Sequence, residues 1–256
     1  MELVGIRREG AVAVLTLNRP EKLNALSSAV EEGLGAAISS RDVTSSGAVV
    51  IAGAGRAFSA GADVREMREQ SVGAVLEYYR TTGEVYERIA ALRQPTIAAI
   101  HGYCLGGGFE LALACDFRVA DETAVFGLPE VTIGIVPSSG GLTRLVRSVG
   151  VSRTKELMLV RERFGADEAL AWGLVTAVAS EGSAEALAIE MAIQLARLPP
   201  LAVEVAKRAA EAAAGSSPEA ALLIERLAYA ALAQTEDHAE ATAAFEEKRD
   251  PRFRGR

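Results

Sequence analysis

TIAAIHGYCLGGGFELALA, residues 96–114, places a short apolar run, a glycine-rich bend and a second apolar run next to one another. Pro95 ends any preceding helix, so the first run is expected to be a strand at 96–100. The segment after the glycines, 107–114, has the spacing of a helix. A strand that turns through small residues into a helix is the repeating unit of layered α/β domains, and we expect that fold class here.

The rest of the first 150 residues continues this alternation. Apolar residues alternate at 4–8 and 12–17 around Glu9-Gly10, which predicts a hairpin. Parallel strands joined by helical crossovers are expected to follow. The other expected elements are a helix capped by Ser27-Ser28, a strand at 48–52, two helical pieces within 63–92 separated near 71–73, a strand at 117–120, and a capped helix near 139–149.

The composition changes after about Arg197, where alanine- and glutamate-rich segments with helical spacing begin. No further strand is predicted. We therefore divide the chain into an α/β core at 1–196, which carries the active site, and a helical oligomerisation region at 197–256. The three expected helices are 201–214, 218–233 and 237–248.

These last helices carry an apolar stripe. It can be buried against the helices' own core or against a neighbouring subunit, and we favour the subunit contact. The stripe includes Leu222, Leu223, Leu227 and Leu232.

Composition narrows the possible functions. The chain has 256 residues, is 50% hydrophobic and carries a net charge of -7, which argues against broad electrostatic binding of DNA or RNA. No apolar run approaches the roughly 20 residues that a membrane-spanning helix needs, and no leader pattern stands near the start. Cys104 and Cys115 lie in apolar segments and are expected to be core side chains. We expect a globular, cytoplasmic protein that does not bind a membrane or nucleic acid.

Two glutamates are candidate catalytic residues. Glu110 closes the sequence GGGFE at 106–110, and Glu130 closes FGLPE at 126–130. A carboxylate that follows a glycine run at the start of a helix can lie beside exposed backbone N–H groups, as acid–base chemistry next to an oxyanion requires. Each glutamate taken singly also fits a structural role, on a solvated helix or after a proline turn.

Two loops of small residues can supply those N–H groups. In RAFSAGADV, residues 56–64, the N–H of Ala62 can face a ligand oxygen, and Asp63 is a candidate N-cap of the next helix. The second loop, 102–108, offers Gly107 as a second donor. Each loop alone also fits a tight strand-to-helix turn, but two such loops together are what an oxyanion hole with two donors would need.

The order and spacing of these segments resemble the crotonase, or enoyl-CoA hydratase/isomerase, superfamily. The resemblance implies an α/β spiral of ββα units with a C-terminal all-helical trimerisation region, assembled as a homotrimer or a hexamer made of two trimers. It also implies acyl-CoA substrates and no metal or redox cofactor. The matching segments are FSAGAD at 58–63, GYCLGGGFELA at 102–112, FGLPE at 126–130, GIVP at 134–137, Gly140-Gly141, NRP at 18–20, NAL at 24–26, EAL at 168–170, GLV at 173–175 and FEEKR at 245–249.

The resemblance also implies roles for individual residues. Ala62 and Gly107 hold the thioester oxygen in the oxyanion hole, Glu110 activates water toward C3, and Glu130 delivers a proton to C2. Because both carboxylates are present, the chain looks most like an enoyl-CoA hydratase, which converts a 2-enoyl-CoA into a 3-hydroxyacyl-CoA. The alternatives are a double-bond isomerase, which generally needs the second glutamate alone, another crotonase-type acyl-CoA lyase, or a non-catalytic RNA-binding relative.

Residues that bind CoA or substrate follow from the same resemblance. Phe245 and Lys248 can reach a CoA across a subunit boundary, although the basic residues also fit ordinary solvated charges. Ser138 departs from the glycine of many hydratases and adds a side chain near the water site. His101 and His238 have no ligand partners at metal spacing, so no metal site is predicted. The implied binding residues are Lys22, Ala60, Ala62, Asp63, Val64, Arg65, Gly107, Phe245 and Lys248.

Overall fold

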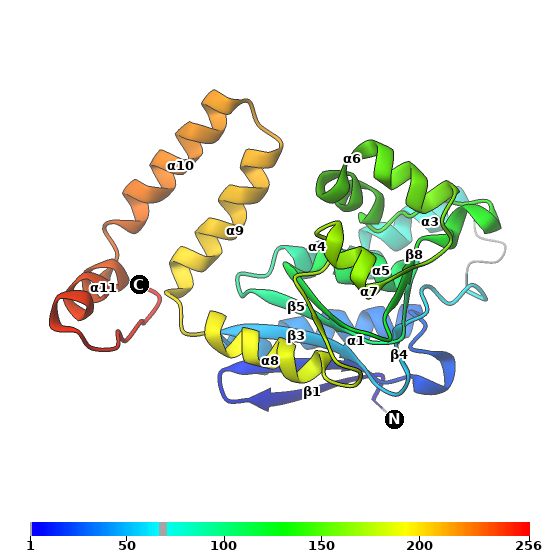
Figure 1. Cartoon of the computed structure of the whole chain (residues 1–256), viewed down its shortest axis with the longest axis horizontal. Coiled ribbons are helices and arrows are strands. Elements are labelled where there is room, and N and C mark those ends of the chain that lie inside the picture. Colours follow the sequence, from blue (N-terminus) through cyan, green and yellow to red (C-terminus); the bar gives the residue numbers. More distant parts are fainter. Residues whose placement is uncertain (1, 67–70) are drawn as a thin grey trace.

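The computed structural model, which describes residues 2–66 and 71–256, is built around a six-stranded sheet (Figure 1). Its first two strands form the predicted antiparallel hairpin, and every other neighbouring pair is parallel. The predicted crossover-connected sheet is therefore confirmed. Its strands, in spatial order, are β1 (Val4–Glu9), β2 (Val12–Leu17), β3 (Ala48–Gly53), β5 (Thr96–Ile100), β7 (Phe117–Asp121) and β10 (Ala177–Ala179).

A second, smaller sheet was not predicted from the sequence. Its strands are only two or three residues long, too short for an alternating pattern to be visible. It joins the two glycine-bearing loops, because β4 and β6 pair in parallel directly before them. The strands, in spatial order, are β4 (Ala57–Ser59), β6 (Tyr103–Leu105), β8 (Val125–Gly127) and β9 (Phe164–Gly165).

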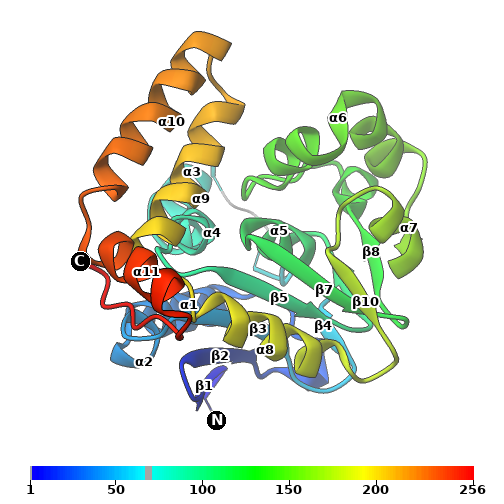
Figure 2. The ribbon, with the colours of Figure 1, turned by 60° about the vertical axis from the view of Figure 1, so that its left-hand side comes forward.

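Helices cover both faces of the large sheet. Figure 2 shows α8 on one side of the sheet and α5 on the other. Along β3, Val49 and Ile51 join the core shared with α1 and α5, whereas Val50 packs with the alanines of α8. A strand covered on both faces reads as a continuous apolar run, which is why β3 has no polar alternation. The helices of the core are α1 (Ser28–Ser39), α2 (Arg41–Thr44), α3 (Val72–Arg80), α4 (Val85–Ala90), α5 (Gly107–Ala114), α6 (Gly141–Leu159), α7 (Ala166–Ala171) and α8 (Ala184–Leu195).

In the part of the chain that the structure describes, three short 3-10 helices lie between the core elements. The cap predicted at Ser27 is confirmed, since its side chain accepts from Val30 N at 3.4 Å. The 3-10 helices are η1 (Pro20–Lys22), η2 (Thr82–Glu84) and η3 (Pro129–Ile133).

One sequence-based boundary is wrong and two others are refined by the structure. Residues 64–66 form a turn, so the helix expected to begin at Asp63 does not start there; residues 67–70 of that expectation lie outside the described residues. Ser71 caps α3, so a helix begins within the predicted separation near 71–73, and η2 forms a further break between α3 and α4. The capped helix predicted near 139–149 is α6, whose N-cap is Gly140 in a left-handed conformation (φ 83°), while the N–H of Ser139 binds Glu110.

The C-terminal helices project from the core as a hairpin followed by a third helix (Figure 1). The apolar stripe predicted on them is exposed, with Leu223 at 57% and Leu227 at 62%. Among the described helices no single one is long and apolar enough to cross a membrane; only α8 and α9 pass that test together, and they meet at a 109° bend. The helices are α9 (Pro200–Ala214), α10 (Pro218–Leu232) and α11 (Glu236–Glu247).

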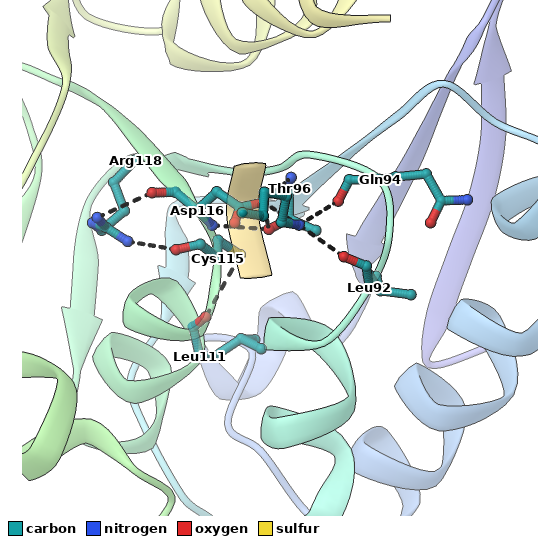
Figure 3. A network of polar contacts seen from close by, with 8 residues as sticks. Leu92, Gln94, Thr96, Leu111, Cys115, Asp116 and Arg118 are labelled. Atoms are coloured by element: carbon teal, nitrogen blue, oxygen red, sulfur yellow. Dashed lines mark hydrogen bonds and ion pairs between the residues drawn. The ribbon is translucent and has the colours of Figure 1, made fainter. Parts of the chain in front are cut away.

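One lysine ties the helical region to the core. Lys207 of α9 donates to Leu92 O at 2.8 Å and Gln94 O at 2.6 Å, and pairs with Asp116 Oδ2 at 2.6 Å. The Asp116 carboxylate also accepts from the backbone N–H and the hydroxyl of Thr96 (Figure 3). It therefore links β5 to the end of α5. This junction fixes the start of the helical region on the sheet that supports the glycine loops.

Replacing Lys207 with methionine is expected to lower the free energy of unfolding by about 2–4 kcal/mol, because a partly buried Asp116 carboxylate loses its counter-charge and two carbonyls lose their donor. Denaturant unfolding at matched protein concentration measures it. The control Arg208→Met removes a neighbouring cation whose side chain is 70% exposed and should cost less than about 0.5 kcal/mol. Equal effects of the two substitutions would contradict this role for Lys207.

Candidate active site

Glu110 lies in the first turn of α5, a helix buried at every residue. Its side chain is 4% exposed, and Oε1 accepts from Ser139 N at 2.8 Å and Gly141 N at 3.0 Å. Burial raises the pKa of Glu110, while these N–H donors and Arg144 oppose the rise by stabilising the ionised form. The carboxylate is therefore held in one orientation by two backbone N–H groups.

The far end of α5 is anchored by a half-buried arginine. Arg118 of β7 donates to Ala112 O at 3.1 Å and to Cys115 O at 2.7 Å, which satisfies carbonyls left free at the helix C-terminus (Figure 3). It also donates to Leu174 O at 2.7 Å. The helix that carries Glu110 is thus fixed at both ends.

Glu130 lies in η3, directly after Pro129, and is 9% exposed. Within residues 2–66 and 71–256, neither carboxylate oxygen of Glu130 has a hydrogen-bond partner. Burial raises the pKa of Glu130 to about 7, and the nearby Glu110 charge adds to the rise. The two glutamates therefore differ in their surroundings, because N–H donors of the kind that Glu110 has, and Glu130 lacks, favour the ionised form of a carboxyl group.

The two predicted N–H donors face one small space. The backbone N–H of Leu26 donates to Gly61 O, and the N–H of Asp63 donates to Leu26 O. Because these two bonds flank Ala62, the Ala62 N–H points away from this strand-like pairing. Gly107 is the first residue of α5, where the N–H has no partner within the helix. An ideal Cβ at Gly107 would lie 3.4 Å from Ala62 N. An oxygen bound there would meet both amides and the positive end of α5.

Glu130 borders the same space. An ideal Cβ at Gly106 would lie 3.0 Å from Glu130 Oε1 and 3.9 Å from Gly61 Cα. The structure therefore brings together the four residues predicted to be catalytic, Glu110 and Glu130 as side chains and Ala62 and Gly107 as backbone donors. Two amides around one oxygen, with an acid and a base beside it, can stabilise an enolate and move protons at the adjacent carbons.

The predicted CoA-binding residues fall into two groups. Ala60, Ala62, Asp63, Val64 and Arg65 follow one another after β4, and Asp63 pairs with Arg19 at 2.8 Å, which lowers the pKa of Asp63. Lys22 lies in η1, whose next residue, Leu23, accepts from Ala60 N.

Phe245 and Lys248 are at the end of α11, on the opposite side of the molecule from β4 (Figure 1). Phe245 is 85% exposed. One chain alone therefore does not bring these two residues to the site.

Sequence reasoning missed two parts of the site. The backbone N–H groups of Ser139 and Gly141 orient Glu110. Every residue except proline has such a group, so only the glycine at 141 could have drawn attention to this loop. Glu31 of α1 is 3% exposed and accepts from the hydroxyls of Tyr78 and Tyr86, but a glutamate within a helical pattern looks like a solvated side chain. In residues 2–66 and 71–256, no cluster of His, Cys, Asp or Glu could hold a metal ion.

A family model described as Enoyl-CoA hydratase/isomerase matches residues 7–256. The chain belongs to this family. It is 42% identical over 252 residues to the 2,3-dehydroadipyl-CoA hydratase of Escherichia coli K12, covering 98% of both chains. It is 39% identical over 253 residues to a short-chain-enoyl-CoA hydratase of Clostridium acetobutylicum, covering 97% of both.

Solved structures agree with the sequence relatives. A crystal structure of enoyl-CoA hydratase from Bacillus anthracis superimposes with a TM-score of 0.92 at 37% identity, covering 99% of this chain and 100% of that one. The resemblance to the enoyl-CoA hydratase/isomerase family and the α/β crotonase-like fold expected from it are confirmed.

Gly141→Ala in this family member is expected to disable Glu110 without unfolding the protein. An ideal Cβ at Gly141 would lie 2.7 Å from Glu110 Oε1, so the carboxylate must move, and a shift of about 1 Å at a reacting group can cost about 100-fold in rate. Turnover and thermal unfolding of the same sample measure both effects. The control Gly165→Ala adds a methyl group to open space at a residue with φ -93°. Full turnover in Gly141→Ala would contradict the assigned geometry.

Proposed function

We propose that this protein is an enoyl-CoA hydratase, which adds water across the 2,3 double bond of a 2-enoyl-CoA thioester to give a 3-hydroxyacyl-CoA. The observation that carries the proposal is the pair of buried glutamates, one with two N–H donors and one with none, beside two backbone amides that face the same space. Full-length similarity to proteins named as enoyl-CoA hydratases supports the same reaction.

In the proposed mechanism, the thioester oxygen accepts from Ala62 N and Gly107 N. Glu110 takes a proton from water while the water oxygen bonds C3, and the electron pair of the double bond moves toward the thioester oxygen as an enolate. Glu130 then delivers its proton to C2, which restores the thioester carbonyl. The amides contribute most where negative charge develops, because they are already oriented and need no rearrangement during the reaction.

The rate of hydration is expected to fall as pH rises above about 7. The pKa of Glu130 is about 7, so its carboxyl group is mostly protonated below that pH and loses the proton it must deliver above it. Once Glu130 is mostly ionised, kcat/KM should fall about tenfold per pH unit. The measurement is kcat/KM for a short 2-enoyl-CoA from pH 5.5 to 9.5. A flat profile between pH 6 and 9 would rule out Glu130 as the acid.

A panel of purified enoyl-CoA esters tests the reaction itself. Loss of the absorbance of the conjugated thioester, with formation of the 3-hydroxyacyl product, is expected for 2-enoyl esters. Turnover of 3-enoyl esters with no water uptake by 2-enoyl esters would instead identify an isomerase. The same panel, varied in chain length, would define which acyl groups the protein accepts.

We also propose how CoA is bound. Lys22, Asp63, Val64 and Arg65 line the nucleotide end of the site, next to Ala60 and Ala62, and Phe245 and Lys248 are supplied by a neighbouring subunit. The exposure of Phe245 and of the stripe that includes Leu223 supports a trimer or a dimer of trimers formed through region 197–256. Sedimentation or light scattering of the purified protein measures the assembly.

No cofactor besides the CoA of the substrate is needed in this scheme, since carboxylates and amides supply each step. We place the protein in the cytoplasm, a reducing compartment that fits the free, buried thiols of Cys104 and Cys115.

A further inference from the structure

Glu31 is a third buried carboxyl group near the proposed site, and the mechanism above does not use it. Its neighbours on the inner face of α1 are apolar, including Val30 and Leu34. Tyr78 Oη lies 2.6 Å from Oε1 and 2.7 Å from Oε2, and Tyr86 Oη lies 2.8 Å from Oε1. Burial raises the pKa of Glu31, and the two hydroxyl donors oppose the rise. A buried carboxyl group is costly to keep unless its contacts are used, whereas an apolar residue would fill the same position without that cost.

Through Tyr86, Glu31 reaches the amide side of the site. Tyr86 is 2% exposed, and its hydroxyl oxygen would lie 3.6 Å from an ideal Cβ at Gly107. The same Cβ would be 3.4 Å from Ala62 N. The Tyr86 hydroxyl therefore forms one wall of the space into which both amides point, and its hydrogen bond to Glu31 turns its proton away from that space.

Through Tyr78, Glu31 also reaches the Glu110 side. Helix α3 has no fully buried side chain, so its position depends on a few polar contacts. One is Tyr78 with Glu31, and another is a short hydroxyl contact between Tyr79 and Ser138. Ser138 precedes Ser139, whose N–H binds Glu110.

The ring of Tyr78 has little room to move. An ideal Cβ at Gly83 would lie 2.8 Å from Tyr78 Cε1, so the glycine is needed for the ring to pack where it does.

We propose that Glu31 is a positioning residue, which holds Tyr86 against the oxyanion hole and, through Tyr78, holds α3 against the loop that orients Glu110. This inference rests on the proposed hydratase function and deepens it. Glu31 acts through the two tyrosines rather than by contacting the reacting atoms. Its side-chain oxygens therefore matter as acceptors, and its negative charge does not.

The test compares Glu31→Ala, Glu31→Gln and the control Glu32→Ala, which changes the exposed neighbour on α1. Glu31→Ala is expected to lower kcat by about 10- to 100-fold with KM changed less than about threefold, because bound substrate is misaligned rather than lost. Glu31→Gln should restore most of kcat, since the amide oxygen still accepts from both hydroxyls. The double variant Glu31→Ala/Tyr86→Phe should have nearly the same kcat as Glu31→Ala alone.

Each other outcome overturns a distinct claim. A stable Glu31→Ala with unchanged kcat would reduce Glu31 to a structural residue. Equal losses in Glu31→Gln and Glu31→Ala would mean that the charge is used. If Glu31→Ala fails to fold, the double variant Tyr78→Phe/Tyr86→Phe removes the same contacts, and wild-type kcat in it would overturn the proposal. A wild-type protein inactive on every enoyl-CoA would overturn the hydratase function and this inference with it.

Discussion

Glu110→Gln and Glu130→Gln are each expected to lower kcat for hydration by about 100- to 10,000-fold, the usual contribution of a positioned acid or base. Glutamine at 110 still accepts from Ser139 N and Gly141 N, so the fold and the loop should be unchanged while the base is lost. Glutamine at 130 keeps a neutral polar group at a site without donors but cannot deliver a proton. Steady-state hydration of a 2-enoyl-CoA measures both losses.

The two substitutions need an independent readout of binding. Affinity for a saturated acyl-CoA, measured by calorimetry, should stay within a few fold of wild type, because neither carboxyl group is assigned to the CoA moiety. Glu122→Gln is the control, since Glu122 is exposed and directly follows β7. Wild-type rates in both variants would refute the acid–base assignment, and loss of folding in either would indicate a structural role.

The second large effect is expected from Gly107→Ala. The added Cβ would be 3.4 Å from Ala62 N and 3.6 Å from both Leu26 Cδ1 and Tyr86 Oη, all ordinary contact distances. The methyl group would nevertheless stand beside any oxygen bound to both amides. We expect kcat/KM to fall about 100- to 1,000-fold, as when one oxyanion donor is lost. Stability should be equal or slightly higher, because alanine favours a helix more than glycine does.

Gly165→Ala separates this effect from that of a methyl group in general. An ideal Cβ at Gly165 has no neighbour within 4 Å, so both activity and stability should stay close to wild type. Gly107→Ala with normal activity would show that the thioester oxygen is bound elsewhere, and the proposed oxyanion hole would have to be abandoned.

Local patterns in the sequence predicted five strands of the large sheet and pointed to the four candidate site residues, but they did not predict β10, which has only three residues. An apolar run such as 48–52 and a glycine bend such as 106–108 are visible without knowing any long-range contact. The small sheet was not predictable, because β9 has two residues and its pairing with β8 is set by the surrounding core. The same holds for Ser139 and Gly141, which act through backbone N–H groups.

Side-chain partners far apart in the sequence were also beyond local reasoning. Glu31 and Tyr86 are 55 positions apart, and only the packing of α1 on α4 brings them together. Asp63 was predicted as a helix cap because of its residue type, but Arg19 lies 2.8 Å away and Asp63 forms an ion pair with it. A nearby cation is a stronger partner for a carboxylate than a helix start that the chain does not form.

A crystal structure with a bound 2-enoyl-CoA analogue is the most direct test of the central claim. The thioester oxygen should lie about 3 Å from both Ala62 N and Gly107 N. The carboxyl groups of Glu110 and Glu130 should lie beside C3 and C2. A thioester oxygen bound to neither amide, or carboxyl groups far from both carbons, would contradict the account.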